Sequence, residues 1–110
     1  MAQNLSDNFK NIVGICANFN TQKTNVILGK ITQTIVGQSF YVEELGNKKY
    51  QISSNSFFQT NPYIAEKILD EIKEQIKKDF KLPTILDAYS GVSTFGIYLS
   101  DVASEITCVE

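Results

Sequence analysis

The sequence predicts an α/β protein, with an α+β sheet region over residues 1–60 followed by the start of a parallel α/β region over residues 61–110. Two observations lead to this prediction. In the first region, short runs rich in Ile, Val and Phe alternate with polar turns, as in antiparallel sheets. In the second, an amphipathic helix precedes a strand, a small-residue loop, a helix and another strand, the order of a βαβ unit.

Several strands are expected in the first region. Residues 11–19, 26–29 and 31–36 are runs of mainly β-branched and other apolar residues separated by polar segments. Residues 39–45 and 48–53 flank Gly46-Asn47. A two-residue link of this kind favours a tight hairpin, because glycine supplies the positive φ that the turn requires.

A helix is expected to begin at Asn61-Pro62, because asparagine caps helices well and proline suits the first turn. Apolar residues then recur at spacings of three and four on one face, while charged residues cover the rest of the helix. The residues of this apolar face are Ile64, Ile68, Leu69, Ile72 and Ile76. Beyond it, residues 84–89 and 105–110 are expected strands, and residues 95–103 are an expected helix.

Composition indicates an ordinary globular protein. Hydrophobic residues make up 43% of the 110 residues and charged residues 20%. No apolar run approaches the roughly 20 residues that span a bilayer, so no membrane association and a cytoplasmic location are expected. Cys16 and Cys108 are the only cysteines and the chain has no histidine. No metal site is therefore predicted, and both cysteines are expected to be buried, free thiols.

Charge leaves a nucleic-acid partner undecided. The net charge is −2, and arginine, the usual bidentate phosphate ligand, is absent. Residues 1–60 hold five lysines against three acids, whereas residues 61–110 hold five lysines against nine acids. The first region is thus mildly basic and the second acidic, which is too weak an asymmetry to establish RNA binding.

The loop after the strand at residues 84–89 is the first candidate site. Small residues after the first strand of a βαβ unit let backbone amides approach a ligand, and an acid ending the second strand can accept from ribose hydroxyls. Gly91 is such a small residue after the first strand, and Glu110 is the acid that ends the second. The segment DAYSG at 87–91 is similar to the first motif of methyltransferases that bind S-adenosylmethionine. The alternative is an ordinary turn with a surface acid.

The segment SFFQTN at 56–61 is the second candidate. Two adjacent aromatic residues followed by an amide could stack on a base and read its edge. Alternatively the aromatic residues belong to the core, one ring on each face. Alternation predicts that Phe57 and Gln59 point to one side, toward the candidate site, and that Phe58 points to the other, toward the core.

The succession TNVILG at 24–29, SFFQTNP at 56–62 and LDAYSG at 86–91 resembles the RNA 5-methyluridine methyltransferases that act on tRNA and ribosomal RNA. The resemblance runs from about residue 12 to residue 110. It implies S-adenosylmethionine as cofactor, rRNA or tRNA as partner, and methyl transfer to carbon 5 of a uridine. It also implies that residues 1–60 are the sheet region of the family's central domain. Residues 61–110 would be the opening helix and first βαβ unit of an incomplete, Rossmann-like methyltransferase domain.

By this resemblance, Gln59 contacts the cofactor and lies near the target uracil, and Phe57 lies in the substrate pocket. Tyr89, Gly91, Thr94 and Glu110 match the other cofactor-binding positions. The family usually has Cys-Gly-x-Gly where this chain has Ser-Gly-Val-Ser, so Ser93 brings a Cβ to a position where glycine lets the backbone approach the ligand.

The family's chemistry implies a cysteine nucleophile that adds to carbon 6 of uracil and a base that removes the carbon 5 proton. Both match positions downstream of this chain, and Cys108 is not that nucleophile by position. We therefore expect an internal fragment with no catalytic residue, inactive alone. The alternatives are a methyltransferase fragment with another acceptor and a non-catalytic RNA-binding or interaction module. The oligomeric state is left open.

Overall fold

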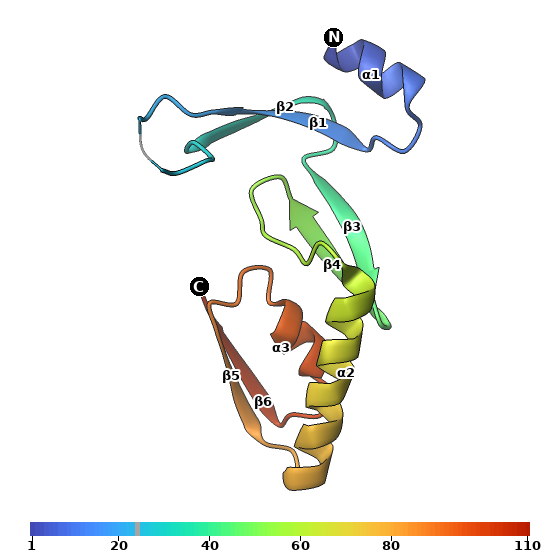
Figure 1. Cartoon of the computed structure of the whole chain (residues 1–110), viewed down its shortest axis with the longest axis vertical. Coiled ribbons are helices and arrows are strands. Elements are labelled where there is room, and N and C mark those ends of the chain that lie inside the picture. The colour runs from blue at the N-terminus through green and yellow to red at the C-terminus, as the bar shows by residue number, and fades with distance from the viewer. Residues whose placement is uncertain (24) are drawn as a thin grey trace. The chain divides into compact units, whose positions relative to one another are not determined.

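The computed structural model describes residues 1–23 and 25–110. It contains both helices and strands, which confirms the predicted α/β class (Figure 1). In chain order the elements are α1 Ala2–Asn8, β1 Gly14–Phe19, β2 Ile31–Gly37, β3 Phe40–Leu45, β4 Lys48–Ser53, α2 Pro62–Asp79, β5 Thr84–Ala88, α3 Thr94–Leu99 and β6 Glu105–Val109. Among the described residues, no helix has the length and apolar character needed to cross a membrane.

The chain forms two compact units. The first comprises residues 1–42 and 51–56, and the second comprises residues 43–50 and 57–110. The sequence predicted a domain boundary near residue 60. That boundary concerns the domains of the family's proteins, which these two units do not test, so it stays a prediction.

In the first unit, β1 and β2 pair antiparallel, with an irregularity between Ile15 and Cys16. The strand expected at residues 26–29 is wrong, because residues 25–30 form a loop. Asparagine side chains, rather than a strand ladder, hold the loop. Asn18 Oδ1 accepts a hydrogen bond from the Gly29 amide at 2.6 Å, and Asn20 donates hydrogen bonds to two carbonyls of the loop. Thr24, the first residue of the TNVILG motif, lies outside the described residues.

The predicted hairpin is confirmed, since β3 and β4 pair across Gly46-Asn47. Gly46 has φ +62°, and a Cβ at this position would lie 2.8 Å from the ring of Tyr98. Glycine is therefore required both by the turn and by its close approach to α3. Leu45 and Tyr50, on either side of the turn, are each only 1% exposed and form part of the core of the second unit.

The helix predicted at Asn61-Pro62 is also confirmed. The Asn61 side chain accepts a hydrogen bond from the amide of Ile64 at 3.1 Å, which satisfies one of the free amides of the first turn. The buried residues of α2 are Ala65 and Leu69, whereas Ile64 and Ile68 are about half exposed. The buried face is thus rotated from the predicted one toward the small residue Ala65.

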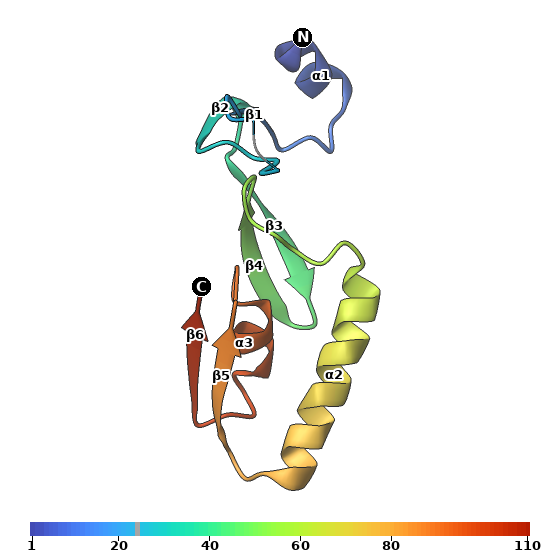
Figure 2. The same ribbon diagram turned by 60° about the vertical axis from the view of Figure 1, so that its left-hand side comes forward.

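β5 and β6 pair in parallel, with Ile85 opposite Ile106. Figures 1 and 2 show α3 between these strands and α2. Gly96 makes this packing possible, because a Cβ there would lie 2.6 Å from Cys108 Sγ. The helix ends at Leu99, earlier than the predicted residue 103.

Both cysteines are free, as predicted, but burial was predicted wrongly. Cys108 is exposed and Cys16 is only partly buried. In the described residues β6 pairs with β5 alone, so its outer edge is open to solvent.

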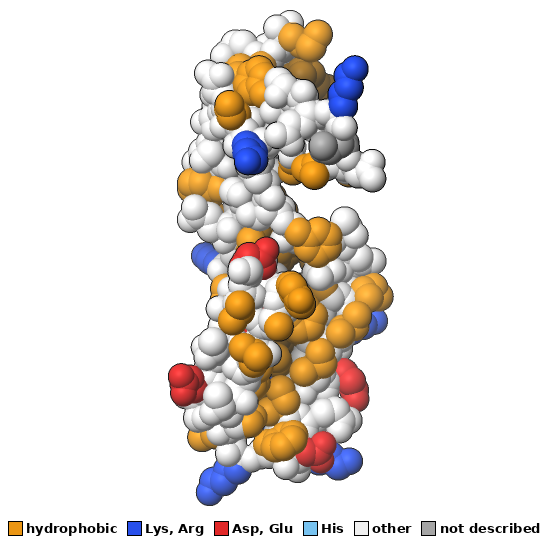
Figure 3. Space-filling model, turned by 90° about the vertical axis from the view of Figure 1, so that its left-hand side faces the viewer, with side chains coloured by type: hydrophobic (Ala, Val, Ile, Leu, Met, Phe, Trp, Pro, Cys, Tyr) orange, Lys and Arg blue, Asp and Glu red, His pale blue; other side chains and the backbone are white. Residues whose placement is uncertain are grey.

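Hydrophobic side chains gather on one face of the second unit, in the lower half of Figure 3. Several large apolar residues of this unit are more than half exposed, among them Leu86 on β5, Val109 on β6 and Tyr89 in the loop between β5 and α3. A parallel sheet is normally covered on both faces. Here α3 covers one face of the β5–β6 pair.

Candidate functional site

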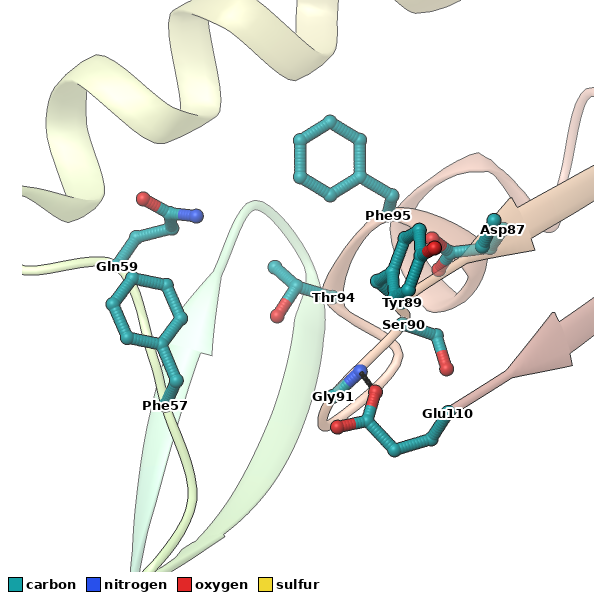
Figure 4. Close-up of a pocket in the computed structure, with 10 residues that line it drawn as sticks. Phe57, Gln59, Asp87, Tyr89, Ser90, Gly91, Thr94, Phe95 and Glu110 are labelled. Atoms are coloured by element: carbon teal, nitrogen blue, oxygen red, sulfur yellow. Dashed lines mark hydrogen bonds between the residues drawn. The ribbon is translucent and has the colours of Figure 1, made fainter. Parts of the chain in front are cut away.

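The second unit contains a pocket of about 370 Å³, within the range of about 300–1,000 Å³ typical of small-molecule sites (Figure 4). It brings together every predicted site residue. Its lining consists of Phe57, Gln59, Asp87, Ala88, Tyr89, Ser90, Gly91, Thr94, Phe95 and Glu110. The binding roles of the predicted residues stay predictions.

One wall is the loop between β5 and α3, whose backbone turns sharply. Tyr89, Gly91 and Ser93 all have positive φ, at 60°, 55° and 56°. A Cβ added to Gly91 would meet nothing within 4 Å, so the backbone angle, rather than crowding, favours glycine there. Gly91 lines the pocket, so this open space leaves room for a ligand.

Glu110 ties this loop to the end of β6. The Gly91 amide donates to Glu110 Oε2 at 2.6 Å, and the Ser90 amide donates to the Val109 carbonyl at 3.0 Å. Within the described residues only Oε2 of this carboxylate has a hydrogen-bond partner. The other oxygen, Oε1, is available to a ligand hydroxyl.

Asp87 and Phe95 also line the pocket, although neither was a predicted site residue. Asp87 Oδ2 accepts from the Gly96 amide at 2.9 Å, which orients its carboxylate at the start of α3. A signal for Asp87 was present: it lies near the carboxyl end of a parallel strand, where ligands bind in α/β folds. Phe95 reaches the pocket because α3 begins at Thr94. No local sequence pattern predicts that position for Phe95.

The opposite wall is the segment at residues 57–59, which has no regular secondary structure. Phe57 and Gln59 line the pocket, and Phe57 is 70% exposed. Phe58 instead packs on Tyr50, with ring centroids 5.6 Å apart. The three side chains thus alternate as predicted.

The charged side chains that line the pocket are acidic. Its lining includes the carboxylates of Asp87 and Glu110 and, among the described residues, neither lysine nor arginine. A phosphate-rich ligand would lack cationic partners here, whereas a ligand with hydroxyl groups and a positive charge would find acceptors and opposite charge. No group of three or more His, Cys, Asp or Glu side chains in the described ranges is placed to hold a metal ion.

No family model matches the chain. Individual proteins do. The chain is 32% identical over 106 residues to an uncharacterized RNA methyltransferase of Oceanobacillus iheyensis, and 37% identical over 106 residues to one of Clostridium acetobutylicum. In each case the match covers 96% of this chain and 23% of the relative. The chain thus spans about a quarter of the length of these relatives.

The fold is similar to that of the tRNA (uracil-54, C5)-methyltransferase of Pyrococcus abyssi, which was solved with S-adenosyl-L-homocysteine. The TM-score is 0.67 and the identity 28%, over 96% of this chain and 32% of that structure. The sequence matches and the structural match cover the same large share of the chain. Over nearly its whole length, the chain is therefore homologous to a segment of proteins named as RNA methyltransferases.

Proposed function

We propose that this chain contributes the S-adenosylmethionine site of an RNA methyltransferase that methylates carbon 5 of a uridine. The observation that supports this most is that one pocket gathers Phe57, Gln59, Gly91 and Glu110 from distant parts of the sequence. In this proposal residues 1–60 are the sheet region of the family's central domain. Residues 61–110 open the methyltransferase domain.

The pocket residues fit the cofactor chemically. Glu110 accepts hydrogen bonds from the ribose hydroxyls through Oε1, while Oε2 continues to accept the hydrogen bond from the Gly91 amide. Tyr89 and Thr94 contact the cofactor beside the open space at Gly91. The acidic lining suits a sulfonium cation better than a phosphate. When bound, S-adenosylmethionine supplies an electrophilic methyl group.

Phe57 is assigned to the target base, and Gln59 to both the cofactor and the target base. The exposed ring of Phe57 offers a face for stacking, and the amide of Gln59 offers a donor and an acceptor to the base edge. The substrate is tRNA or rRNA, and the structural relative that acts on uracil 54 of tRNA favours tRNA. A cytoplasmic location belongs to the same proposal. No residue of this chain is assigned as nucleophile or base.

Isothermal titration of the 110-residue chain with S-adenosylhomocysteine tests the proposal. Glu110→Gln removes a charged acceptor and should weaken binding about tenfold, because a hydrogen bond to a charged group contributes about 1.5–3 kcal/mol. Glu105→Gln is the matched control: this glutamate begins β6, the strand that Glu110 follows, is exposed and does not line the pocket. Equal weakening by both variants, or no binding by the unaltered chain, would overturn the proposal.

A further inference from the structure

Tyr50 lies behind both walls of the pocket without lining it. It is part of β4 and is 1% exposed, so its side chain has no access to solvent or ligand. The hydroxyl is a neutral hydrogen-bond donor at ordinary pH, and burial raises its pKa further, to about 12.

The hydroxyl of Tyr50 contacts the first wall. It donates to the backbone carbonyl of Thr94 at 3.4 Å, a long hydrogen bond between buried groups. Thr94 is 7% exposed, begins α3 and lines the pocket. A change at this contact therefore acts directly on the start of α3.

The ring of Tyr50 contacts the second wall. It packs on Phe58 at 5.6 Å with the ring planes tilted by 50°. Phe58 lies between the two pocket residues Phe57 and Gln59, in a segment that belongs to no strand or helix. No strand ladder fixes residues 57–59, so the packing of Phe58 on Tyr50 constrains where their side chains point.

We propose that Tyr50 is a positioning residue that sets the spacing between the Gln59 wall and the Thr94 wall of the pocket. Its hydroxyl holds one wall and its ring holds the other. This inference rests on the proposed cofactor site, and it adds a residue that does not itself touch the cofactor.

Two substitutions separate the contributions. Tyr50→Phe keeps the ring on Phe58 and removes the bond to Thr94, so the dissociation constant for S-adenosylhomocysteine should rise about threefold. Tyr50→Leu also removes the aromatic packing, and the rise should be about tenfold or more. In the ligand-free chain, the amide resonance of Phe95 should already shift in Tyr50→Phe, and that of Gln59 should shift in Tyr50→Leu.

Tyr98→Phe is the matched control. Tyr98 is also buried, at 6% exposure, and its hydroxyl donates to Asp70 at 2.7 Å, but it does not line the pocket. This variant should lose stability at least as much as Tyr50→Phe and leave the dissociation constant unchanged. A merely structural role of Tyr50 would make the two variants alike in binding as well as in stability.

The outcomes separate this inference from the proposed function. Binding by the unaltered chain with an unchanged constant in Tyr50→Phe overturns the positioning role alone. Absence of binding by the unaltered chain overturns the proposed function, and the ligand-free resonances then decide the positioning role. A shift at Phe95 in Tyr50→Phe and at Gln59 in Tyr50→Leu, with neither in Tyr98→Phe, supports it. Unmoved resonances contradict it.

Discussion

Glu110 accepts a hydrogen bond from the backbone amide of Gly91 at 2.6 Å, although the two residues are 19 positions apart in sequence. The contact joins the end of β6 to the loop that follows β5. It follows from the parallel pairing of the two strands, which brings their carboxyl ends to the same edge. The proposed cofactor site is built on this edge.

Gly96→Ala should destabilise the chain by about 1–3 kcal/mol, because the new methyl group would overpack the contact between α3 and the strands. The added Cβ would meet Cys108 Sγ at 2.6 Å. Urea unfolding of the variant measures the loss. Cys108→Ala in the same chain should recover part of it, while Cys108→Ala alone should have little effect because this residue is exposed. Equal losses in the single and double variants would contradict the contact.

Ser93→Gly should raise the free energy of unfolding by up to about 1 kcal/mol, because Ser93 has φ 56° and left-handed backbone is costly for a residue with a Cβ. Ser90→Gly is the control, since Ser90 is not among the residues with positive φ. That substitution should lower stability through the greater freedom of the unfolded chain. Thermal unfolding of both variants distinguishes them, and a lower melting temperature for Ser93→Gly would refute the prediction.

The stabilising contribution of Asp101 should be lost in acid. The hydrogen bond from Lys73, at 2.6 Å, lowers the pKa of Asp101 below its usual value of 3.8. Because the folded pKa lies below the unfolded one, the stabilisation is present above the unfolded pKa and is lost as pH falls through the folded pKa. The effect is small and screened by salt, because the Asp101 side chain is 47% exposed.

Unfolding free energies of the unaltered chain and Asp101→Asn at about pH 6 and about pH 2 measure this contribution. The gap between the two proteins should be present at the higher pH and close at the lower. A gap that is unchanged at acid pH would mean that the charge of Asp101 does not contribute.

The chain alone should bind the cofactor without methylating RNA. Cys16 and Cys108 are its only thiols, and neither lines the pocket. Incubation with labelled S-adenosylmethionine and a uridine-containing RNA should therefore transfer no label, with a full-length relative as positive control. Transfer that persists after Cys16→Ala and Cys108→Ala would show that another residue acts. Transfer lost only in Cys108→Ala would make that thiol the nucleophile.

Features that depend on local chemistry were predictable from the sequence. Gly46 specified the hairpin turn and Asn61 the helix start, because each acts on backbone within three residues of itself. Alternation at residues 57–59 likewise predicted that Phe57 and Gln59 share a side while Phe58 packs elsewhere.

Features that depend on distant packing were not predictable. Residues 26–29 have a strand-like composition, but Asn18 and Asn20 satisfy the backbone of this loop from another part of the chain. The helix at Ala2–Asn8 has no buried residue and so no apolar pattern. Phe95 enters the pocket only because α3 begins at Thr94 and packs close against β5 through Gly96.

The most direct test of the central claim is to map S-adenosylhomocysteine on the isotope-labelled 110-residue chain by amide chemical-shift changes. The account predicts saturable changes at Gln59, Gly91, Thr94 and Glu110, which lie on both walls of the pocket. The smaller pocket of the first unit, which Gly14 and Tyr41 line, should not respond. Changes confined to that second pocket, or no change at saturating ligand, would contradict the assignment of the cofactor site.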